Sequence, residues 1–334
     1  MIASGLSSAA DAGFSAPLEA VPPALQDGVV AIGNFDGVHR GHQAVLTRAR
    51  DIARAGARPV VALTFEPHPR SVFRPDQPIF RLTPPALKAR VLQAVGIDGL
   101  VTATFDRPFA SLTAQEFVDE VVIGRLRARH LLVGYNFHFG KARAGNPAFL
   151  AEAGARAGFE VTVAEPLTDE AGGQISSTRI RDALSAGDVA GANGLLGWRW
   201  RVDAVVRHGD KRGRELGYPT ANMRLPDDCA LAYGIYAVRV TLDGRRIDGV
   251  ASFGRRPTFD NGAPLLEVFL FDFSGDLYGR TLGVTFHDYL RPELRFTSIE
   301  GLIDQMGRDC ERALAVLKSA GPLSPTDAAL DGLG

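Results

Sequence analysis

Two histidines, His39 and His42, stand three residues apart directly after a glycine-containing turn, Gly33–Gly37. The turn follows the apolar run Val29–Ile32, which is typical of a buried strand, and precedes a helical pattern that begins near Gly41. The start of a helix offers free N–H groups and the positive end of its dipole, so it favours phosphate. Two imidazoles there could donate hydrogen bonds to charge that builds up on phosphate oxygens in a transition state. The candidate phosphate-binding residues of this segment are Gly33, Asn34, Phe35, Asp36 and Gly41.

The two histidines also have simpler interpretations. They could be surface residues at the start of a helix, or two ligands of a metal ion. No third metal ligand lies nearby in the sequence, and neither the P-loop pattern nor the dinucleotide GxGxxG pattern is present. The position of the turn between a strand and a helix favours phosphate chemistry over a pair of surface histidines.

Three later segments add polar groups to the same predicted sheet edge. Thr64–Pro69 leaves the second predicted strand, and its prolines fix a loop beside the turn. Val133–Gly140 follows a later strand and offers Asn136 as a polar contact. Ile175–Arg181 places hydroxyl groups at the start of a helix and an arginine one turn later, a combination that can clamp phosphate, although Ser-Ser-Thr alone is usually only a helix cap. The candidate residues of this clamp are Ser176, Ser177, Thr178 and Arg181.

A second group of motifs begins with a basic loop, His208–Gly217, in which glycines recur every four residues. Such a loop can wrap a polyphosphate with its backbone N–H groups. Thr220 and Asn222 follow on one side of an extended segment, and their neutral oxygens suit Mg²⁺ together with phosphate and water. A glycine-rich hairpin with a basic rim is the simpler alternative. The candidate phosphate-binding residues of the loop are Gly209, Gly213 and Arg214.

One carboxylate, Glu267, interrupts the apolar run Leu265–Phe271. Burial of a carboxylate without partners costs several kcal/mol, so its place in an apolar strand needs a reason. Glu267 is either an ordinary solvent-facing strand residue or a base that takes a proton from a substrate hydroxyl.

The elements that position these residues follow two patterns. From Gly28 to Ala164, strands alternate with helices, which predicts a parallel sheet with helices on both faces. After about Leu196, short strands are separated by Gly, Pro and Asp turns, which is typical of a small antiparallel barrel. A final helix is expected to begin at the capping box Thr297–Glu300.

Composition narrows the class of protein. The chain has 334 residues, which suits two domains, and its net charge of -1 disfavours a globally basic nucleic-acid binder. Two cysteines exclude a disulfide scaffold and a cysteine-rich zinc module, and fit a reducing compartment. The sequence shows neither a membrane-spanning run nor a signal peptide. We therefore expect a cytoplasmic protein without nucleic-acid or membrane partners.

Four motifs in order, GNFDGVHRGHQ, TFEPHP, VGYNFHFG and ISSTRIR, resemble the adenylyltransferase half of the bacterial bifunctional riboflavin kinase/FAD synthetase family. GRELGYPTANM, the RRPT turn, LLEVFLFDFSGDLYG and LRPELRF resemble the riboflavin kinase module of the same family. In the third motif, where the family commonly has an acidic residue and an arginine, this chain has Tyr135, Asn136 and His138.

The resemblance implies an N-terminal α/β Rossmann-like nucleotidyltransferase fold with a parallel sheet, then a small antiparallel β-barrel with a terminal helix. The expected parts are a disordered tail over 1–24, an FMN adenylyltransferase domain over 25–186, a linker over 187–198, a riboflavin kinase domain over 199–318 and a C-terminal tail over 319–334.

The resemblance also implies that the barrel phosphorylates riboflavin with ATP to give FMN. Glu267 would be the general base on the ribityl hydroxyl, and Thr220 and Asn222 would hold Mg²⁺. Asn136 and Arg291 would contact the flavin.

The N-terminal domain would then join FMN to the AMP part of ATP, giving FAD and pyrophosphate, with His39, His42 and Arg181 stabilising the developing charge. The small-molecule partners would be ATP, riboflavin, FMN and FAD, and a weak homo-oligomer stays open. Two alternatives are a related nucleotidyltransferase with another acceptor and a flavin-binding or regulatory protein that has lost catalysis. The PTAN barrel argues against the first, and the presence of all the candidate catalytic residues argues against the second.

Overall fold

The computed structural model describes residues 13–209, 213, 216–255 and 264–332. The chain divides into two compact units. The first holds residues 1–79 and 83–175, and the second holds residues 80–82 and 176–334. Each unit has its own sheet and its own hydrophobic core.

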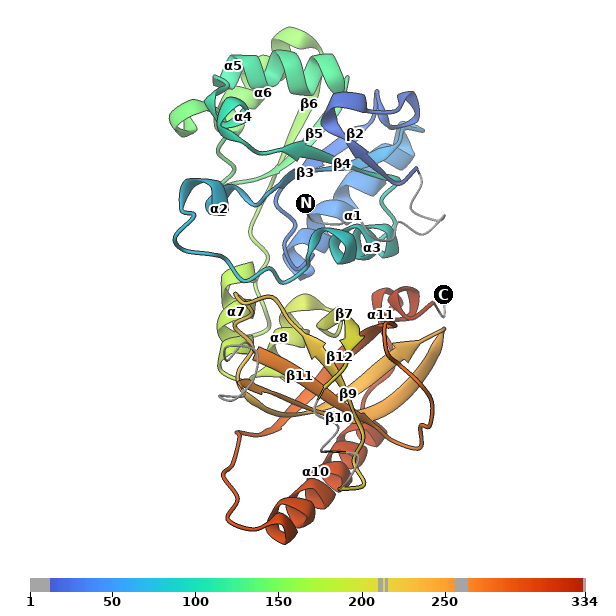
Figure 1. The fold of residues 1–334 in the computed structure, drawn as a ribbon. Coiled ribbons are helices and arrows are strands. Elements are labelled where there is room, and N and C mark those ends of the chain that lie inside the picture. Colours follow the sequence, from blue (N-terminus) through green and yellow to red (C-terminus); the bar gives the residue numbers. More distant parts are fainter. Residues whose placement is uncertain (1–12, 210–212, 214–215, 256–263, 333–334) are drawn as a thin grey trace. The chain divides into compact units, whose positions relative to one another are not determined.

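Six parallel strands form the sheet of the first unit, in the order β1-β4-β3-β2-β5-β6 (Figure 1). The chain moves from β2 through β3 to β4 in one direction and then returns to β5 on the other side of β2. Open parallel sheets bind ligands beyond the carboxyl ends of the strands at such a reversal, so the ends of β2 and β5 are where a site is expected. The strands are β1 (Ser15–Pro17), β2 (Val29–Ile32), β3 (Val60–Glu66), β4 (Gly99–Thr104), β5 (His130–Gly134) and β6 (Glu160–Ala164).

Helices cover both faces of this sheet, as the sequence predicted (Figure 1). Val61, Leu63 and Phe65 of β3 enter one core with residues of α5, η3 and α6. Because side chains alternate along a strand, Thr64 and Glu66 point to the other face, which α1 and α3 cover. The helices of this unit are η1 (Leu18–Ala20), η2 (Pro23–Leu25), α1 (Arg40–Ala55), α2 (Pro69–Phe73), α3 (Pro85–Ala94), α4 (Arg107–Ser111), α5 (Ala114–Glu116), the π-helical η3 (Phe117–Arg125), η4 (Lys141–Arg143) and α6 (Pro147–Ala157).

Part of the segment predicted as a disordered tail over 1–24 is ordered. β1 pairs in parallel with β4 at the edge of the sheet, and Leu18 and Leu25 are buried in the core beside it. A three-residue strand and two short turns produce no hydrophobic period, so the sequence analysis missed them. Residues 1–12 lie outside the described residues.

A closed barrel of six antiparallel strands forms the second unit, in the order β10-β11-β8-β7-β12-β9, which confirms the predicted fold class. Strand β8, which the sequence indicated only as an extended segment, completes the barrel between β7 and β11. The strands are β7 (Arg201–Arg207), β8 (Thr220–Arg224), β9 (Gly234–Leu242), β10 (Arg245–Arg255), β11 (Pro264–Leu270) and β12 (Thr281–Arg291).

Two helices precede the barrel, α7 (Ser177–Ser185) and α8 (Val189–Leu196), and the second occupies most of the predicted linker. Asp188 caps α8 by accepting a hydrogen bond from the N–H of Gly191 at 2.8 Å, and Leu196 is buried. The indole N–H of Trp200 then donates to the carbonyl of Leu82 at 3.0 Å, which ties the start of the barrel to the segment 80–82 of the same unit.

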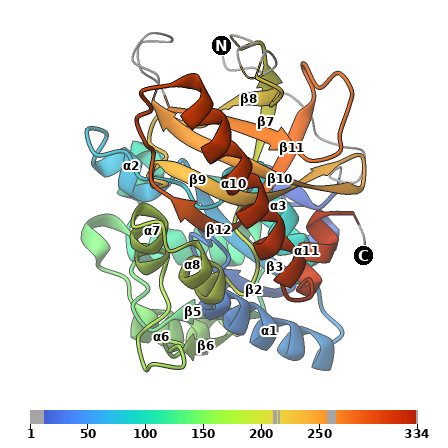
Figure 2. The same cartoon turned by 90° about the horizontal axis from the view of Figure 1, so that it is seen from below.

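A long helix, α10 (Ile299–Ser319), runs along the outside of the barrel against β9, β10 and β12 (Figure 2). Ala313 and Leu317 join a small core beneath it. The hydroxyl of Ser298 accepts the N–H of Gly301 at 3.0 Å, so the cap lies one residue after the Thr297 that the sequence indicated.

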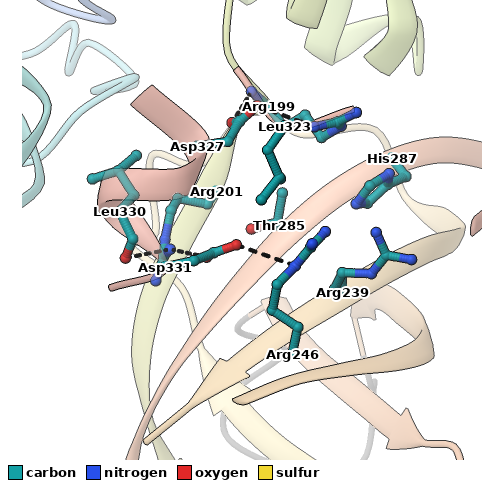
Figure 3. Close-up of a pocket in the computed structure, with 10 residues that line it drawn as sticks. All are labelled: Arg199, Arg201, Arg239, Arg246, Thr285, His287, Leu323, Asp327, Leu330 and Asp331. Carbon is teal, nitrogen blue, oxygen red and sulfur yellow. Dashed lines mark hydrogen bonds and ion pairs between the residues drawn. The ribbon is translucent and has the colours of Figure 1, made fainter. Parts of the chain in front are cut away.

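The C-terminal segment also folds, where a tail over 319–334 was predicted. Helix α11 (Pro325–Leu330) begins at a capping box between Ser324 and Asp327. It brings Asp327 and Asp331 against arginines on the outer face of the barrel (Figure 3).

These carboxylates form an ion-pair network around a small cavity (Figure 3). Arg199 lies 3.1 Å from Asp327, and Asp331 lies 3.1 Å from Arg201 and 3.3 Å from Arg246. Only 4% of the Arg201 side chain and 8% of the Asp331 side chain are exposed. Neither charge can therefore be left without its partner at low cost.

His287 lines the same cavity. Its burial, followed by the positive charges of Arg239, Arg199 and Arg246, lowers its pKa to about 3. Since the unfolded chain binds this proton near pH 6.5, the neutral His287 contributes stability above that pH and makes the unit less stable as the pH falls below it.

We predict that Asp331→Asn lowers the free energy of unfolding by about 3 kcal/mol, because it removes the carboxylate that the buried Arg201 shares with the half-buried Arg246 and leaves Arg201 paired with Asp203 alone. The change is measured by denaturant unfolding of the whole chain. Asp227→Asn is the control, since the Arg224–Asp227 pair is exposed and is expected to contribute less than about 0.5 kcal/mol. Equal effects of the two substitutions would show that the Asp331 carboxylate adds no more stability than an exposed ion pair.

Candidate active sites

The turn after β2 has a strained backbone. Phe35 and Val38 have φ values of 47° and 38°, and Gly37 between them has a φ of 86°. This left-handed region is unfavourable for a β-branched residue such as Val38, and such strain persists only where the surroundings enforce it. A turn of this kind indicates a functional site.

Buried polar groups enforce the turn. The carboxylate of Asp36 accepts the N–H of Thr83 at 3.0 Å, and the hydroxyl of Thr83 accepts the N–H of Gly37 at 2.8 Å. On the other side, the hydroxyl of Thr64 donates to the carbonyl of Asn34 at 3.1 Å. Asp36 and Thr83 are both buried, so Asp36, predicted to bind phosphate, here supports the backbone of the turn.

The two histidines come together at the start of α1. His39 is the cap of the helix, and its Nδ1 accepts the N–H of His42 at 3.3 Å. The two rings stack with centroids 3.7 Å apart. Because Nδ1 of His39 is an acceptor, a neutral His39 carries its proton on Nε2 and can donate it.

His42 is held neutral. Its burial, followed by the charges of His39 and Lys88, lowers its pKa well below the ordinary value. The buried Nδ1 of His42 has no hydrogen-bond partner among the described residues. The edge of the ring faces Phe35 at 5.3 Å between centroids. His39 is a buried helix cap, and His42 is neutral and stacks on it. The two residues are therefore not a pair of surface histidines.

The loop after β5 leaves the sheet next to the strained turn, since β2 and β5 are neighbours. Asn136 is exposed in this loop, and its carbonyl contacts Nδ1 of His138 at 2.9 Å. Phe139 anchors the loop in the core and stacks on Phe137. The fold thus brings Asn136 to the predicted sheet edge, while its contact with a flavin stays a prediction.

The predicted phosphate clamp lies at the start of α7. Ser176 caps this helix by accepting the N–H of Arg179 at 3.3 Å, as in the simpler interpretation of the motif. Nε of Arg181 donates to the carbonyl of Phe80 at 2.7 Å. Ser176, Ser177, Thr178 and Arg181 all belong to the second unit, and their binding of phosphate stays a prediction.

In the barrel, strand pairing places Glu267 beside Asn222. Glu267 of β11 lies opposite Asn222 of β8 and opposite Ser252 of β10, and Asn222 lies opposite Arg207 of β7. Residues directly opposite each other in antiparallel strands point to the same face. The candidate base, which is half-buried, and one candidate metal ligand are therefore neighbours on one face of the barrel.

Asn222 has an unsatisfied oxygen. Only 7% of the residue is exposed, its Nδ2 donates to the carbonyl of Thr220 at 3.2 Å, and its buried Oδ1 has no hydrogen-bond partner among the described residues. Gly209 packs directly against this amide, since a Cβ on Gly209 would lie 2.5 Å from Nδ2 and 2.8 Å from Oδ1. A buried acceptor without a hydrogen-bond partner calls for an explanation such as a bound water or ion, and an amide oxygen suits Mg²⁺.

Other predicted residues of the barrel have different surroundings. Arg291 forms a two-pronged ion pair with Asp309 of α10, with Nη2 2.5 Å from Oδ2 and Nε 2.8 Å from Oδ1. Its guanidinium therefore ties β12 to α10. Gly213 packs against the carbonyl of Tyr218. Arg214 and the RRPT turn at 256–258 lie outside the described residues.

Comparison with known proteins decides the family. The family model described as FAD synthetase matches residues 21–179, and that described as riboflavin kinase matches residues 196–317. A bifunctional riboflavin kinase/FMN adenylyltransferase from Pseudomonas fluorescens is 43% identical over 289 residues, which cover 86% of this chain and 92% of that protein. This chain belongs to the bifunctional riboflavin kinase/FMN adenylyltransferase family.

Other members of the bifunctional family are also similar over most of their length. The protein from Escherichia coli K12 is 41% identical over 86% of this chain and 92% of its own, and that from Bacillus subtilis 168 is 37% identical over 86% and 91%. A crystal structure described as a macrolide-efflux protein from Streptococcus pneumoniae has a TM-score of 0.81 and 34% identity, and covers 92% of this chain and 100% of that chain. The comparisons do not favour the two alternative functions.

Among the residues that the structure describes, no three His, Cys, Asp or Glu side chains gather in a way that could hold a metal ion. None of the helices described is both long and apolar enough to span a membrane.

The sequence analysis missed two buried residues of the adenylyltransferase unit, Thr83 and Lys88. Thr83 is a single hydroxyl residue in a loop, and no sequence pattern distinguishes it from surface threonines. Lys88 does leave one, because it lies on the buried stripe of α3 with Leu87, Val91 and Leu92. A charged side chain on the buried face of a helix is costly unless it is paired, so its presence indicates an ion pair or a functional role.

We predict that two glycine substitutions separate the two activities. In Gly41→Ala, the new Cβ would lie 3.1 Å from Nδ1 and Cε1 of His39, so the ring must move and FAD formation should fall by about a hundredfold. In Gly209→Ala, the Cβ would collide with the amide of Asn222, so riboflavin phosphorylation should fall similarly.

Each of these variants is the control for the other, and both are assayed with riboflavin and with FMN as the starting flavin. Gly194→Ala serves as a neutral control, because a Cβ at this helical position meets no atom within 4 Å. Loss of both activities in either variant would contradict the assignment of one site to each unit.

Proposed function

We propose that this enzyme forms FMN from riboflavin and ATP in the barrel unit, and FAD from FMN and ATP in the parallel-sheet unit. The observation that supports the proposal best is that the histidine motif lies in the parallel-sheet unit and the motif residues Glu267 and Asn222 lie in the barrel, although Ser176–Arg181 belong to the second unit. The stacked histidines lie at the strained turn after β2, and Glu267 lies opposite Asn222 in the barrel.

In the kinase reaction, Glu267 takes the proton of the terminal ribityl hydroxyl of riboflavin. The hydroxyl oxygen then attacks the γ-phosphorus of ATP, and the bond to ADP breaks. Thr220 and Asn222 would hold Mg²⁺, because Asn222 keeps a buried oxygen without a hydrogen-bond partner among the described residues. When bound, the ion neutralises charge on the phosphates of ATP. Gly209 and Gly213 let the loop approach these phosphates closely.

In the adenylyl transfer, a phosphate oxygen of FMN attacks the α-phosphorus of ATP, and pyrophosphate leaves. The FMN phosphate is already an anionic nucleophile, so no covalent intermediate is needed. His39 and the neutral His42 would donate hydrogen bonds to the phosphates, and Arg181 would supply positive charge. Asn136 would contact the flavin. Catalysis here depends on positioning and on charge stabilisation.

The proposed partners are ATP, riboflavin, FMN and FAD. Two free cysteines, Cys229 and Cys310, fit a reducing cytoplasm as the place of both reactions. Incubation of the protein with riboflavin, ATP and Mg²⁺, followed by chromatographic separation of the flavins, tests the function as a whole. FMN and FAD must both appear, and absence of either product would contradict the proposal.

We predict that His42→Ala and Glu267→Gln have opposite effects on the two products. Loss of the His42 donor should slow FAD formation by a hundred- to a thousandfold, on the order found for single donors to developing charge, and spare FMN formation. Gln at position 267 cannot accept the proton, so riboflavin phosphorylation should fall on the order of a hundred- to ten-thousandfold, while supplied FMN is still converted to FAD.

Product analysis with riboflavin in one reaction and FMN in another separates these outcomes. A wild-type rate of phosphorylation in Glu267→Gln would show that this residue is only part of the strand. Equal loss of both activities in His42→Ala would indicate misfolding instead of a lost donor.

We predict that Asn222→Ala raises the Mg²⁺ concentration needed for half-maximal phosphorylation of riboflavin by at least about tenfold, since it removes a proposed ligand. The measurement is a Mg²⁺ titration of the initial rate at fixed ATP. FAD formation from FMN is the internal control and should keep its Mg²⁺ dependence. An unchanged titration in the kinase assay would exclude Asn222 as a ligand.

A further inference from the structure

Lys88 of α3 is a lysine with almost no contact with solvent. Only 1% of its side chain is exposed, although it carries a charge inside the adenylyltransferase unit. The chain has only four lysines among 37 basic residues. A lysine rather than an arginine is therefore notable here, because an ammonium is a compact point charge with three donors that can point in different directions.

Two side chains of β3 hold this ammonium. Nζ of Lys88 lies 2.7 Å from a carboxylate oxygen of Glu66 and donates to the hydroxyl of Thr64 at 3.2 Å. Thr64 and Glu66 are two residues apart, so both point to the face of the sheet that α3 covers. Thr64 is buried, and 18% of the Glu66 side chain is exposed.

The hydrogen bonds continue from Thr64 into the strained turn Gly33–Gly37 after β2. Since the Thr64 hydroxyl accepts from Lys88, its own proton is available, and it donates to the carbonyl of Asn34 at 3.1 Å. Asn34 directly precedes Phe35, where the left-handed conformation begins. The chain from Glu66 through Lys88 and Thr64 therefore ends on the backbone that carries the strain.

A purely structural role explains this arrangement poorly. Replacement of a buried ion pair by apolar residues is often neutral or stabilising, so an ion pair is a weak way to fill a core. Lys88 is also close enough to His42 for its charge to lower the pKa of that imidazole. Position and charge thus both point to the reaction site.

We propose that Lys88 is a positioning residue for adenylyl transfer, which fixes the turn Gly33–Gly37 through Thr64 and keeps a buried positive charge near the histidines. This inference rests on the proposed function of the first unit. It assigns Glu66 the task of holding the ammonium, and it predicts that the charge itself is needed and not only the packing of the side chain.

The test compares Lys88→Met with the double variant Lys88→Met/Glu66→Gln in the full chain. The single variant removes the ammonium that faces Glu66 and should lose both thermal stability and FAD formation. The double variant removes both charges, so its unfolding temperature should return close to that of the wild type. Its kcat for FAD formation should stay on the order of a hundredfold low, with the KM for FMN nearly unchanged.

Thr64→Val is a third variant, which cuts the hydrogen-bond chain but leaves the Lys88–Glu66 ion pair in place. It should also lower kcat, by about tenfold or more. Arg129→Met is the matched control, because Arg129 forms an exposed ion pair with Asp27 in the same unit and should leave FAD formation unchanged. Phosphorylation of riboflavin reports on the other unit in every variant.

Recovery of both stability and FAD formation in the double variant would overturn the inference, since Lys88 would then be only half of a structural ion pair. A wild-type rate in Thr64→Val would overturn the link to Asn34. Failure of the wild-type enzyme to make FAD would instead refute the proposed function, so the two failures are distinguishable.

Discussion

The adenylyltransferase unit depends on one short backbone turn that cannot hold its own conformation. Phe35 and Val38 occupy the left-handed region, and the chain relaxes unless other groups prevent it. Buried hydrogen bonds from Thr83 and Thr64 prevent this on two sides. The direction in which α1 leaves the sheet, and with it the stacking of the two histidines, follows from that restraint.

In the barrel, strand register and not a strained turn positions the side chains of the candidate site. Its site uses the register of neighbouring strands, which places Glu267, Asn222 and Arg207 in one row across β11, β8 and β7. Register is rigid because a slip by one residue would move every side chain to the other face. The unsatisfied oxygen of Asn222 is thus kept in place by the sheet and by the close approach of Gly209.

The C-terminal segment shows that the folded barrel unit extends beyond the part that its family model matches. That match ends at residue 317, yet Asp327 of α11 and Asp331 supply carboxylates for the half-buried Arg199 and for the buried Arg201 of β7. A buried charge is costly without a partner, and Asp203 of the same strand supplies one partner of Arg201. A second partner, Asp331, comes from the end of the chain, 130 residues after Arg201.

The sequence by itself determined the two fold classes, the family and the residues of both motif sets, because hydrophobic period, turn residues and ordered motifs are local signals. It predicted His39, His42, Asn222 and Glu267 without their surroundings. Tertiary structure alone decided that Glu267 faces Asn222, that Asp36 supports the turn and that Lys88 reaches it through Thr64. It also revealed β1 and α11, which are too short to leave a period. These features depend on strand register and on contacts between residues far apart in the chain, and no local pattern of residue types encodes them.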